Sequence, residues 1–437
     1  MKNKINFLFL TVDGGGNIPP VLGIAKRLLQ RGHEVSVLTE PCLQSPVKSF
    51  GFHFIPFKCH FTRENRNEDI CQDWNDSPLK KPTVFKNIIF GPAKITVKET
   101  LEALEQTKAD VLVVDCLLFP ALIAGEYLNI PRALLFHMPE YLPGKNRPPG
   151  VMGLIPGKGK LGKIRDRLLG RIFSKVFNSH LSQINAIRKD LGLEELNDLI
   201  SMIHQADLRM IQTLKSFDFP LYPAPANVRY TGPVLDDPDW VEQWKAPWQQ
   251  GDKRPMVVVS FSTTFQNQAS IVKRCIQALA ELPVRALVTL GWAINLEDIK
   301  VPDHVKVIRS APHSRVFPDA ALVITHGGHG TIMRALANGL PLIVIPMGRD
   351  QHDNAAKIAY HGCGIRLSTT TGKAKIQSAI EQILSTGAYS VKASAFQAEI
   401  LQEASKDLGI LELEQLAMPF LQDTAKASQL SNARGSE

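Results

Sequence analysis

Histidines, glycines and a threonine follow one another in residues 326–331, where the sequence reads HGGHGT. The preceding residues 321–325 are apolar and mostly β-branched, as in a strand that is buried on both faces. The turn leads into a predicted helix, whose first backbone N–H groups have no partner within the helix. These groups and the helix dipole both favour an anion, so the turn predicts a phosphate site. The residues expected to contact the phosphate are His326, Gly328, His329, Gly330 and Thr331.

A second group of polar residues follows the next predicted strand, residues 340–345. Asp350, Gln351 and Asn354 stand beyond its carboxyl end, where their side chains are suited to hydrogen-bonding a ligand that is rich in hydroxyl groups. The two groups together fit a diphosphate to which a sugar is attached.

Two plainer interpretations of the turn remain open. Many α/β proteins place a glycine-rich turn before a helix without binding a ligand there. Two histidines three residues apart also suggest a metal site, but no cysteine or carboxylate nearby completes a set of ligands. Asp237 and Asp239 flank a proline and resemble an Asp-x-Asp metal motif, but they lie in a linker and predict a turn. We therefore expect no metal and no other cofactor.

The stretch 321–367 resembles the donor-binding signature of the nucleotide-sugar glycosyltransferases with the GT-B fold. The segments HGGHGT, GLP, IPMGRDQ and DNAA match in order and spacing. This is the family of the plant secondary-metabolite and bacterial antibiotic glycosyltransferases (family 1). The resemblance implies an α/β protein in which two Rossmann-like, doubly wound parallel-sheet domains face a central cleft. The nucleotide sugar is then a co-substrate and not a cofactor.

The resemblance extends to further donor-binding positions. Thr263 follows Ser262 at the end of a predicted strand, where a hydroxyl group would meet the distal phosphate. His313 lies in the segment that corresponds to the family's base-binding segment. Arg334 stands where the plant members have a glutamate that binds the ribose hydroxyls. The donor nucleotide is therefore not determined by the resemblance, and a UDP sugar and a dTDP sugar are equally plausible donors.

The acceptor side departs from the family pattern. The loop after the first strand usually carries Gly-His, in which the histidine is the general base, but this chain has Gly16-Asn17. Asparagine accepts no proton, so another group must act as the base. Asp115 matches the aspartate that normally orients the histidine. The candidate bases, in order of preference, are Asp13, Asp115 and His137, and Glu140 is a further candidate contact on the acceptor side.

The pattern of the whole chain fits this fold. A chain of 437 residues is long enough for two domains with separate cores. Short apolar strands alternate with helical segments in both halves, which predicts parallel sheets with helices on both faces. In the first half, residues 167–191 predict one long helix. The predicted boundaries are an acceptor-binding domain at 1–228, a linker at 229–252, a donor-binding domain at 253–405, a helix returning to the first domain at 406–421, and a disordered tail at 422–437.

The composition limits the location and the partners. The segment after Lys4 is too short for a signal peptide, no apolar run is long enough to span a bilayer, and the six cysteines have no paired spacing. These features predict a cytoplasmic protein, either a monomer or a homodimer. Much of the net charge of +8 lies in residues 145–175. This segment is compatible with a solvated surface, with a lid over the acceptor, or with a weak contact with anionic lipid. Nucleic acid is not expected, because this segment lacks interleaved aromatic residues.

We therefore expect an inverting, metal-independent glycosyltransferase that moves a hexose from a nucleoside diphosphate to a small hydrophobic or aromatic acceptor. Three alternatives remain. Asn17 is compatible with a donor-binding pseudoenzyme or helper subunit, the basic segment is compatible with a glycolipid synthase at a membrane surface, and an epimerase would use the same donors. The acceptor itself depends on the loops at about 58–82 and 138–165.

Overall fold

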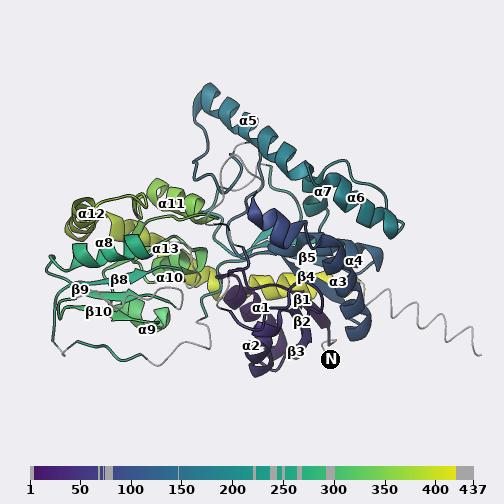
Figure 1. Ribbon diagram of the computed structural model, residues 1–437, viewed down its shortest axis with the longest axis horizontal. Helices are drawn as coiled ribbons and strands as arrows, with labels where there is room; N and C mark the ends of the chain where they lie inside the picture. The colour runs from purple at the N-terminus through teal and green to yellow at the C-terminus, as the bar shows by residue number, and fades with distance from the viewer. Residues whose placement is uncertain are drawn as a thin grey trace, which may run out of the picture.

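The computed structural model contains two parallel sheets, each covered by helices on both faces (Figure 1). It describes residues 4–66, 69–71, 73, 82–145, 147–219, 223–236, 244–248, 251–262, 268–291 and 301–419. This architecture confirms the α/β fold class that the alternation of strands and helices predicts.

The first sheet has the strand order β3-β2-β1-β4-β5-β6-β7, and all its neighbouring strands run parallel. Alternate residues of β1 enter different cores, with Leu8 and Leu10 on one face and Phe7 and Phe9 on the other. A strand buried on both faces needs apolar residues throughout, which is why these strands read as continuous apolar runs. The strands are β1 (Asn6–Leu10), β2 (Glu34–Thr39), β3 (His53–Pro56), β4 (Val111–Asp115), β5 (Arg132–Phe136), β6 (Leu208–Ile211) and β7 (Val228–Tyr230).

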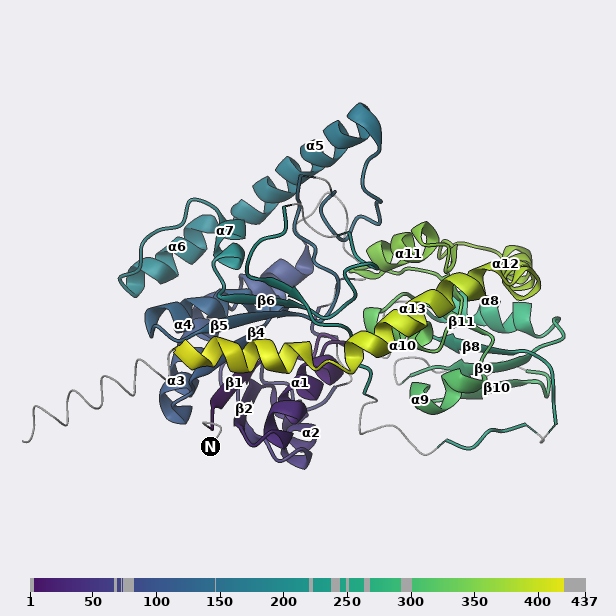
Figure 2. The same ribbon diagram turned by 180° about the vertical axis from the view of Figure 1, so that it is seen from behind.

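Helices cover both faces of this sheet (Figures 1 and 2). The regular helices are α1 (Ile18–Gln30), α2 (Gln44–Ser49), α3 (Ala93–Thr107), α4 (Leu122–Tyr127), α5 (Gly159–Asn178), α6 (Leu181–Asp190) and α7 (Leu199–His204). Shorter turns lie at Pro41–Leu43, Phe85–Ile89 and Cys116–Ala121.

The second sheet has the order β10-β9-β8-β11-β12-β13 and is also parallel. Its strands are β8 (Met256–Ser260), β9 (Arg285–Thr289), β10 (Val305–Ile308), β11 (Leu322–Thr325), β12 (Leu342–Val344) and β13 (Gly364–Arg366). Its helices are α8 (Ala269–Leu279), α9 (His313–Val316), α10 (His329–Ala337), α11 (Gln351–Tyr360), α12 (Lys373–Thr386) and α13 (Ala388–Ala404), with a short turn at Phe317–Asp319.

Each sheet has one point at which the strand order reverses direction, beside β1 and β4 in the first sheet and beside β8 and β11 in the second. Ligands of open α/β sheets bind at the carboxyl ends of the strands at such points. The loops after β1, β4, β8 and β11 are therefore the ones that position a site.

The chain returns to the first domain at its C-terminal end. Helical residues 408–419 follow α13, and Ile410, Leu413 and Ala417 lie in the same core as Phe7 and Phe9 (Figure 2). The predicted tail at 422–437 lies outside the described residues. Within the described part of the chain, no helix combines the length and the apolar character that a membrane span requires.

Three elements differ from the prediction. The single helix expected at 167–191 is two helices, α5 and α6, and α5 begins earlier, at Gly159. The break falls at His180, whose ring stacks on Phe90 at 4.2 Å, so packing overrides the continuous helical pattern. The short strands β7 and β13 have no clear apolar alternation in the sequence, and β7 runs across the predicted linker boundary at residue 228.

Candidate active site

The glycine turn after β11 has the backbone that an anion site needs. Gly327 has a φ of +100°, and a Cβ there would lie 2.7 Å from Cγ1 of Val344. Only glycine therefore fits this position without strain. Gly328 is the N-cap residue of α10, and no side chain caps the helix. The N–H of Thr331 donates to the carbonyl oxygen of Gly328 at 3.1 Å, so the N–H groups of His329 and Gly330 are the ones that remain for a ligand.

Two histidines of the second domain flank this turn in neutral form. Burial lowers the pKa of His326 to about 4 and that of His313 to about 3. Nε2 of His313 lies 3.1 Å from Oγ of Ser260, which ends β8, and its ring stacks on Phe317. At neutral pH these imidazoles are uncharged hydrogen-bonding groups, so the attraction for an anion comes from the helix end.

His329, the first residue of α10, bonds to the first domain. Its Nε2 donates to the carbonyl oxygen of Gln212, 3.0 Å away, in the segment that follows β6 of the first sheet. Nδ1 of the same ring is buried and has no partner among the described residues. This ring therefore joins the two domains, and its expected contact with the donor stays a prediction. A helix start can be predicted from the sequence, whereas the direction in which its first side chain points depends on the other domain.

The residues at the start of α11 support the turn. Nδ2 of Asn354 donates to the carbonyl oxygen of Gly327 at 2.9 Å and to Oδ2 of Asp350 at 2.8 Å. Oε1 of Gln351 accepts from the backbone N–H groups of Met347 and Gly348. Asn354 and Gln351 therefore hold the loop in shape. Burial raises the pKa of Asp350, although the charge of His137 acts in the opposite direction.

Asn17 occupies a fixed position at the start of α1. Its Nδ2 lies 2.7 Å from Oδ2 of Asp115 and 2.7 Å from the carbonyl oxygen of Val12. Oγ1 of Thr11 lies 2.9 Å from the same carboxylate oxygen of Asp115. The pair of residues 17 and 115 is thus in contact, but with an amide in place of an imidazole. Gly16 is exposed, and a Cβ there would meet no atom within 4 Å.

A histidine approaches Asp115 from the neighbouring strand. Asp115 ends β4 and lies opposite Leu135 of β5, so His137, two residues further on, is on the same face of the sheet. Nδ1 of His137 is 3.4 Å from Oδ1 of Asp115 and 3.9 Å from Sγ of Cys116. With Nδ1–H directed at the carboxylate, the lone pair of the neutral ring lies on Nε2, which bonds to no described residue.

The charged forms of His137 and Asp115 stabilise each other. Burial opposes the charged form of His137, but the charges of Asp115 and Cys116 outweigh it and raise the pKa of His137 well above its ordinary value. Burial also favours the neutral acid of Asp115, but His137 and the N–H of Leu117 outweigh it and lower the pKa of Asp115. Asp115 therefore favours the protonated form of His137, and His137 favours the ionised form of Asp115.

The other two acids expected on the acceptor side are engaged by arginines. Oδ2 of Asp13 is 2.5 Å from Nε of Arg66, and Oδ1 accepts from the N–H of Gly15. Glu140 is 2% exposed, and its Oε1 lies 2.6 Å from Nη1 of the fully buried Arg209. A structural role accounts for Glu140. Of the three candidate bases, His137 alone combines a partly exposed ring with an unbonded acceptor atom.

The two halves of the candidate site lie within electrostatic range of each other. The charge of His137 affects the pKa values of both Asp350 and His329, which belong to the second domain. We therefore define the candidate site as the junction between the first turn of α10 and the His137–Asp115 pair. Thr263, which was expected beside it, lies outside the described residues.

Arg349 was not among the expected site residues. It lies in the loop after β12, and its guanidinium bonds to Asp69, to Asp73 and to the carbonyl oxygen of Gly14 at 2.6–3.0 Å. It has a φ of +55° and lowers the pKa of His326, so it is close to the glycine turn. The sequence did contain a signal for Arg349, because this residue belongs to the IPMGRDQ segment of the donor signature. Its partners Asp69 and Asp73 lie in the polar stretch 58–82, and no local pattern predicts where that stretch is placed.

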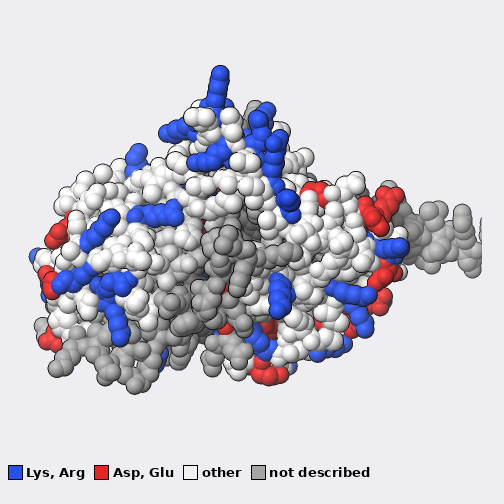
Figure 3. All heavy atoms as spheres, turned by 45° about the horizontal axis from the view of Figure 1, so that its top comes forward, with Lys and Arg blue, Asp and Glu red and all other residues white. Residues whose placement is uncertain are grey.

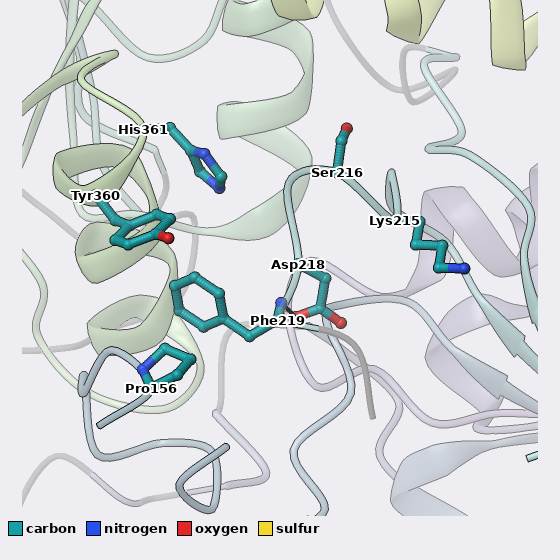
Figure 4. Close-up of a pocket in the computed structure, with 7 residues that line it drawn as sticks. All are labelled: Pro156, Lys215, Ser216, Asp218, Phe219, Tyr360 and His361. Carbon is teal, nitrogen blue, oxygen red and sulfur yellow. Dashed lines mark hydrogen bonds between the residues drawn. The ribbon is translucent and has the colours of Figure 1, made fainter. Parts of the chain in front are cut away.

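A cluster of possible metal ligands and a cavity between the domains are two further features of the structure. Among the described residues, Asp115, Cys116 and His137 form a cluster whose possible metal ligands lie within 4.8 Å of one another. The contact between Nδ1 and Asp115 already accounts for this grouping. A separate cavity of about 410 Å³ also lies between the domains (Figure 4). None of the expected site residues lines it, and Phe219 packs there against Tyr360 at 5.2 Å.

Comparisons with known proteins agree with this geometry. Residues 273–410 match the family model of the erythromycin biosynthesis protein CIII-like C-terminal domain. The chain is 28% identical over 402 residues to 4'-demethylrebeccamycin synthase of Lentzea aerocolonigenes, which covers 90% of this chain and 94% of that protein.

Solved structures of glycosyltransferases have the same fold. The glycotransferase of kitacinnamycin has a TM-score of 0.75 at 19% identity and covers 95% of this chain and 100% of its own. The glycosyltransferase VinC in complex with dTDP has a TM-score of 0.66 at 15% identity, with 95% and 100% covered. At such identities these likenesses show the fold, which is GT-B.

Proposed function

Because the chain belongs to the family 1 glycosyltransferases with the GT-B fold, of the antibiotic and UDP-glycosyltransferase type, we propose that it transfers a hexose from a UDP or dTDP sugar. The acceptor is a small hydrophobic or aromatic molecule. The transfer inverts the anomeric centre and needs no metal ion. The observation that supports this proposal is that the N-terminus of α10 has no side-chain cap and that the charge of His137, in the His137–Asp115 pair, affects the pKa of His329 in its first turn.

On the donor side, the diphosphate binds at the first turn of α10. The N–H groups of His329 and Gly330, the hydroxyl group of Thr331 and the positive end of the helix stabilise the negative charge that develops as the diphosphate leaves. Neutral His326 adds a hydrogen bond. This electrostatic stabilisation supplies what a divalent cation supplies in other phosphate sites, and it supports a metal-independent reaction.

On the acceptor side, His137 acts as the general base. Nε2 takes the proton of the acceptor hydroxyl group while the acceptor oxygen forms a bond to the anomeric carbon. The bond between that carbon and the phosphate oxygen breaks, and the diphosphate leaves with the electron pair. Attack from the face opposite the leaving group inverts the anomeric centre. Asp115 keeps Nδ1–H in place and stabilises the imidazolium.

Asp115 and Asp13 are weaker candidates for the base. Asp115 is 1% exposed and already accepts hydrogen bonds from Thr11, Asn17 and Leu117. Asp13 is held by Arg66. Neither carboxylate has a free, exposed oxygen comparable with Nε2 of His137.

The choice between the two donor nucleotides rests on the surroundings of Arg334. Its guanidinium donates to the carbonyl oxygen of Asp236, and its charge affects the pKa of His313. An arginine supplies no acceptor for ribose hydroxyl groups. A dTDP sugar, which lacks the 2′-hydroxyl, is therefore favoured over a UDP sugar, and the relative VinC in complex with dTDP supports this choice. A cytoplasmic location is also part of the proposal, and the six free cysteines support it.

A thermal-shift screen of nucleoside diphosphates tests the donor side. We expect dTDP and UDP to raise the melting temperature, with dTDP having the larger effect, and we expect GDP and ADP to have little effect. Addition of a chelator should not change the result. If no nucleoside diphosphate stabilises the protein, the proposed donor site is wrong.

A catalytically silent donor-binding protein is the second candidate, and Asn17 is the observation that favours it. In that case dTDP would bind tightly, no acceptor would be glycosylated, and His137→Ala would change nothing. Turnover that disappears in His137→Ala while dTDP binding persists would exclude this candidate.

A further inference from the structure

Helix α5 stands apart from the rest of the first domain. Figures 1 and 2 show it rising from α7 and α6 and extending away from both sheets. Its inner face is anchored by Phe177, which is buried, and by Phe173, which packs against the same core. The rest of the helix therefore presents a long surface that the protein does not cover.

The uncovered surface carries an apolar stripe. Its members recur every three or four residues, so they lie on one side of the helix. They are exposed by 83% at Leu161, 56% at Ile164, 55% at Leu168, 48% at Ile172 and 39% at Val176. Single exposed apolar residues are common, but five in one row mark a surface that binds something.

Basic residues lie along one flank of this stripe. Lys160, Lys163, Arg167, Arg171 and Lys175 recur with the same helical spacing, and none of them bonds to any other described residue. The single acid of the helix, Asp166, is buried and bonded to Arg165. Figure 3 shows Lys and Arg side chains gathered on this projecting part of the molecule.

The apolar surface continues into the loop that precedes α5. Val151, Met152 and Ile155 are also exposed. The same loop is fixed to the donor domain, because the carboxylate of Asp353 accepts from the N–H groups of Val151 and Gly153 at 2.5 and 2.7 Å. Asp353 lies on α11, beside Asn354. The projecting surface is thus mechanically connected to the candidate site.

We propose that α5 docks on an anionic lipid bilayer. Its apolar stripe lies in the interface between the headgroups and the acyl chains, and its basic flank contacts lipid phosphates. The charge of the helix selects this occupant over a second copy of the chain, because two copies packed through this stripe would bring two basic flanks together. The proposal concerns the docking surface and does not depend on the proposed reaction.

Co-sedimentation with vesicles tests the proposal. The full chain is mixed with phosphatidylcholine vesicles that contain or lack phosphatidylglycerol. We expect binding to the anionic vesicles, weakened by salt. Leu161→Ser/Leu168→Ser should lower the partition coefficient at least about tenfold, since both leucines lose the apolar surface that they would bury in the bilayer interface. Arg167→Gln/Arg171→Gln should weaken binding to anionic vesicles only.

The matched control is Val391→Ser/Leu401→Ser on α13, where the two side chains are 70% and 52% exposed. This variant should bind vesicles like the wild type. All variants should melt at the same temperature, because the substituted side chains are exposed. The proposal is overturned if the wild type binds no vesicles or binds neutral ones equally well, or if both α5 variants bind like the control. A dimer in sedimentation velocity that Leu161→Ser/Leu168→Ser abolishes would also overturn it, in favour of a second copy.

Discussion

At the scale of single residues, the proposed proton acceptor lies on a different strand end from the one that usually carries it in the family. The loop after β1 supplies an amide at Asn17, and the imidazole comes from His137, after β5. Both contact the carboxylate of Asp115. Asp115 is therefore placed to orient His137, and we propose that this pair replaces the pair that a histidine at position 17 would form.

Removal of His137 should abolish most of the activity. We expect His137→Ala to lower kcat about 10²–10⁴-fold, because general base assistance contributes a factor of that size. The Kd for dTDP, measured by calorimetry, should stay unchanged because His137 does not contact the diphosphate. The control is Asp13→Asn, which should retain activity. A larger loss in Asp13→Asn than in His137→Ala would mean that Asp13 is the base.

The rate should depend on pH through the same pair. Only the neutral imidazole accepts a proton, and the pKa of His137 is raised. The value of kcat/KM should therefore increase as the pH rises above the ordinary range of histidine. Asp115→Asn removes the charge that raises this pKa, so the inflection should move to lower pH. An unchanged inflection in this variant would show that a different group titrates.

Glycine 327 should tolerate no side chain. Gly327→Ala combines a φ of +100° with a contact of 2.7 Å to Val344, and it should destabilise the fold by about 1–3 kcal/mol. Nucleoside diphosphate binding should weaken strongly, since the turn would change shape. Gly16→Ala is the matched control, because its new methyl group meets open space. Equal melting temperatures and equal binding in both variants would contradict this account of the turn.

At the scale of elements, the strand ends determine which residues meet. Thr11, Asp115 and His137 follow three neighbouring parallel strands, so their side chains converge at one edge of the first sheet. A similar edge of the second sheet carries Ser260 and the glycine turn. A buried ion pair between Glu140 and Arg209 joins the segment after β5 to β6.

That ion pair should be important for stability. Arg209→Ala leaves the buried carboxylate of Glu140 with only the more distant Arg147, whose Nη1 lies 3.8 Å away, and loss of the closer partner costs roughly 3–5 kcal/mol. Chemical denaturation should show this loss. The double variant Glu140→Leu/Arg209→Met should recover part of it, because the carboxylate and Arg209 are both removed and only Arg147 loses a partner. If Arg209→Ala unfolds at the same denaturant concentration as the wild type, the pair does not stabilise the fold.

The glycine turn, the parallel sheets and the contact between positions 17 and 115 could be predicted from the sequence. Each depends on a local motif or on strand order. The role of His329 could not be predicted, because it depends on the carbonyl group of Gln212 in the other domain. The contact between Arg66 and Asp13 could not be predicted either, because no local pattern in the polar stretch 58–82 indicates where Arg66 lies.

At the scale of the whole molecule, contacts across the junction hold the two domains together. Arg349 binds Asp69 and Asp73, the ammonium group of Lys357 lies 3.5 Å from Asp218, and His329 bonds to Gln212. The donor and acceptor sides belong to different domains, so the reaction depends on these contacts as much as on the reacting groups.

Loss of Arg349 should loosen the junction. Truncation of one partner of a buried charge pair costs at least about 2 kcal/mol, so Arg349→Ala should lower kcat/KM roughly tenfold or more. Its radius of gyration in small-angle X-ray scattering should increase. Arg254→Ala, which removes an exposed pair with Asp252 within one domain, should change neither quantity. An unchanged radius and unchanged kinetics in Arg349→Ala would show that this contact does not control the junction.

The most direct test of the central claim is a crystal structure of the protein with dTDP. We predict that the terminal phosphate accepts hydrogen bonds from backbone N–H groups in the first turn of α10, on the side that faces His137. A diphosphate bound instead in the cavity lined by Lys215 and His361, with the first turn of α10 blocked by side chains, would contradict it.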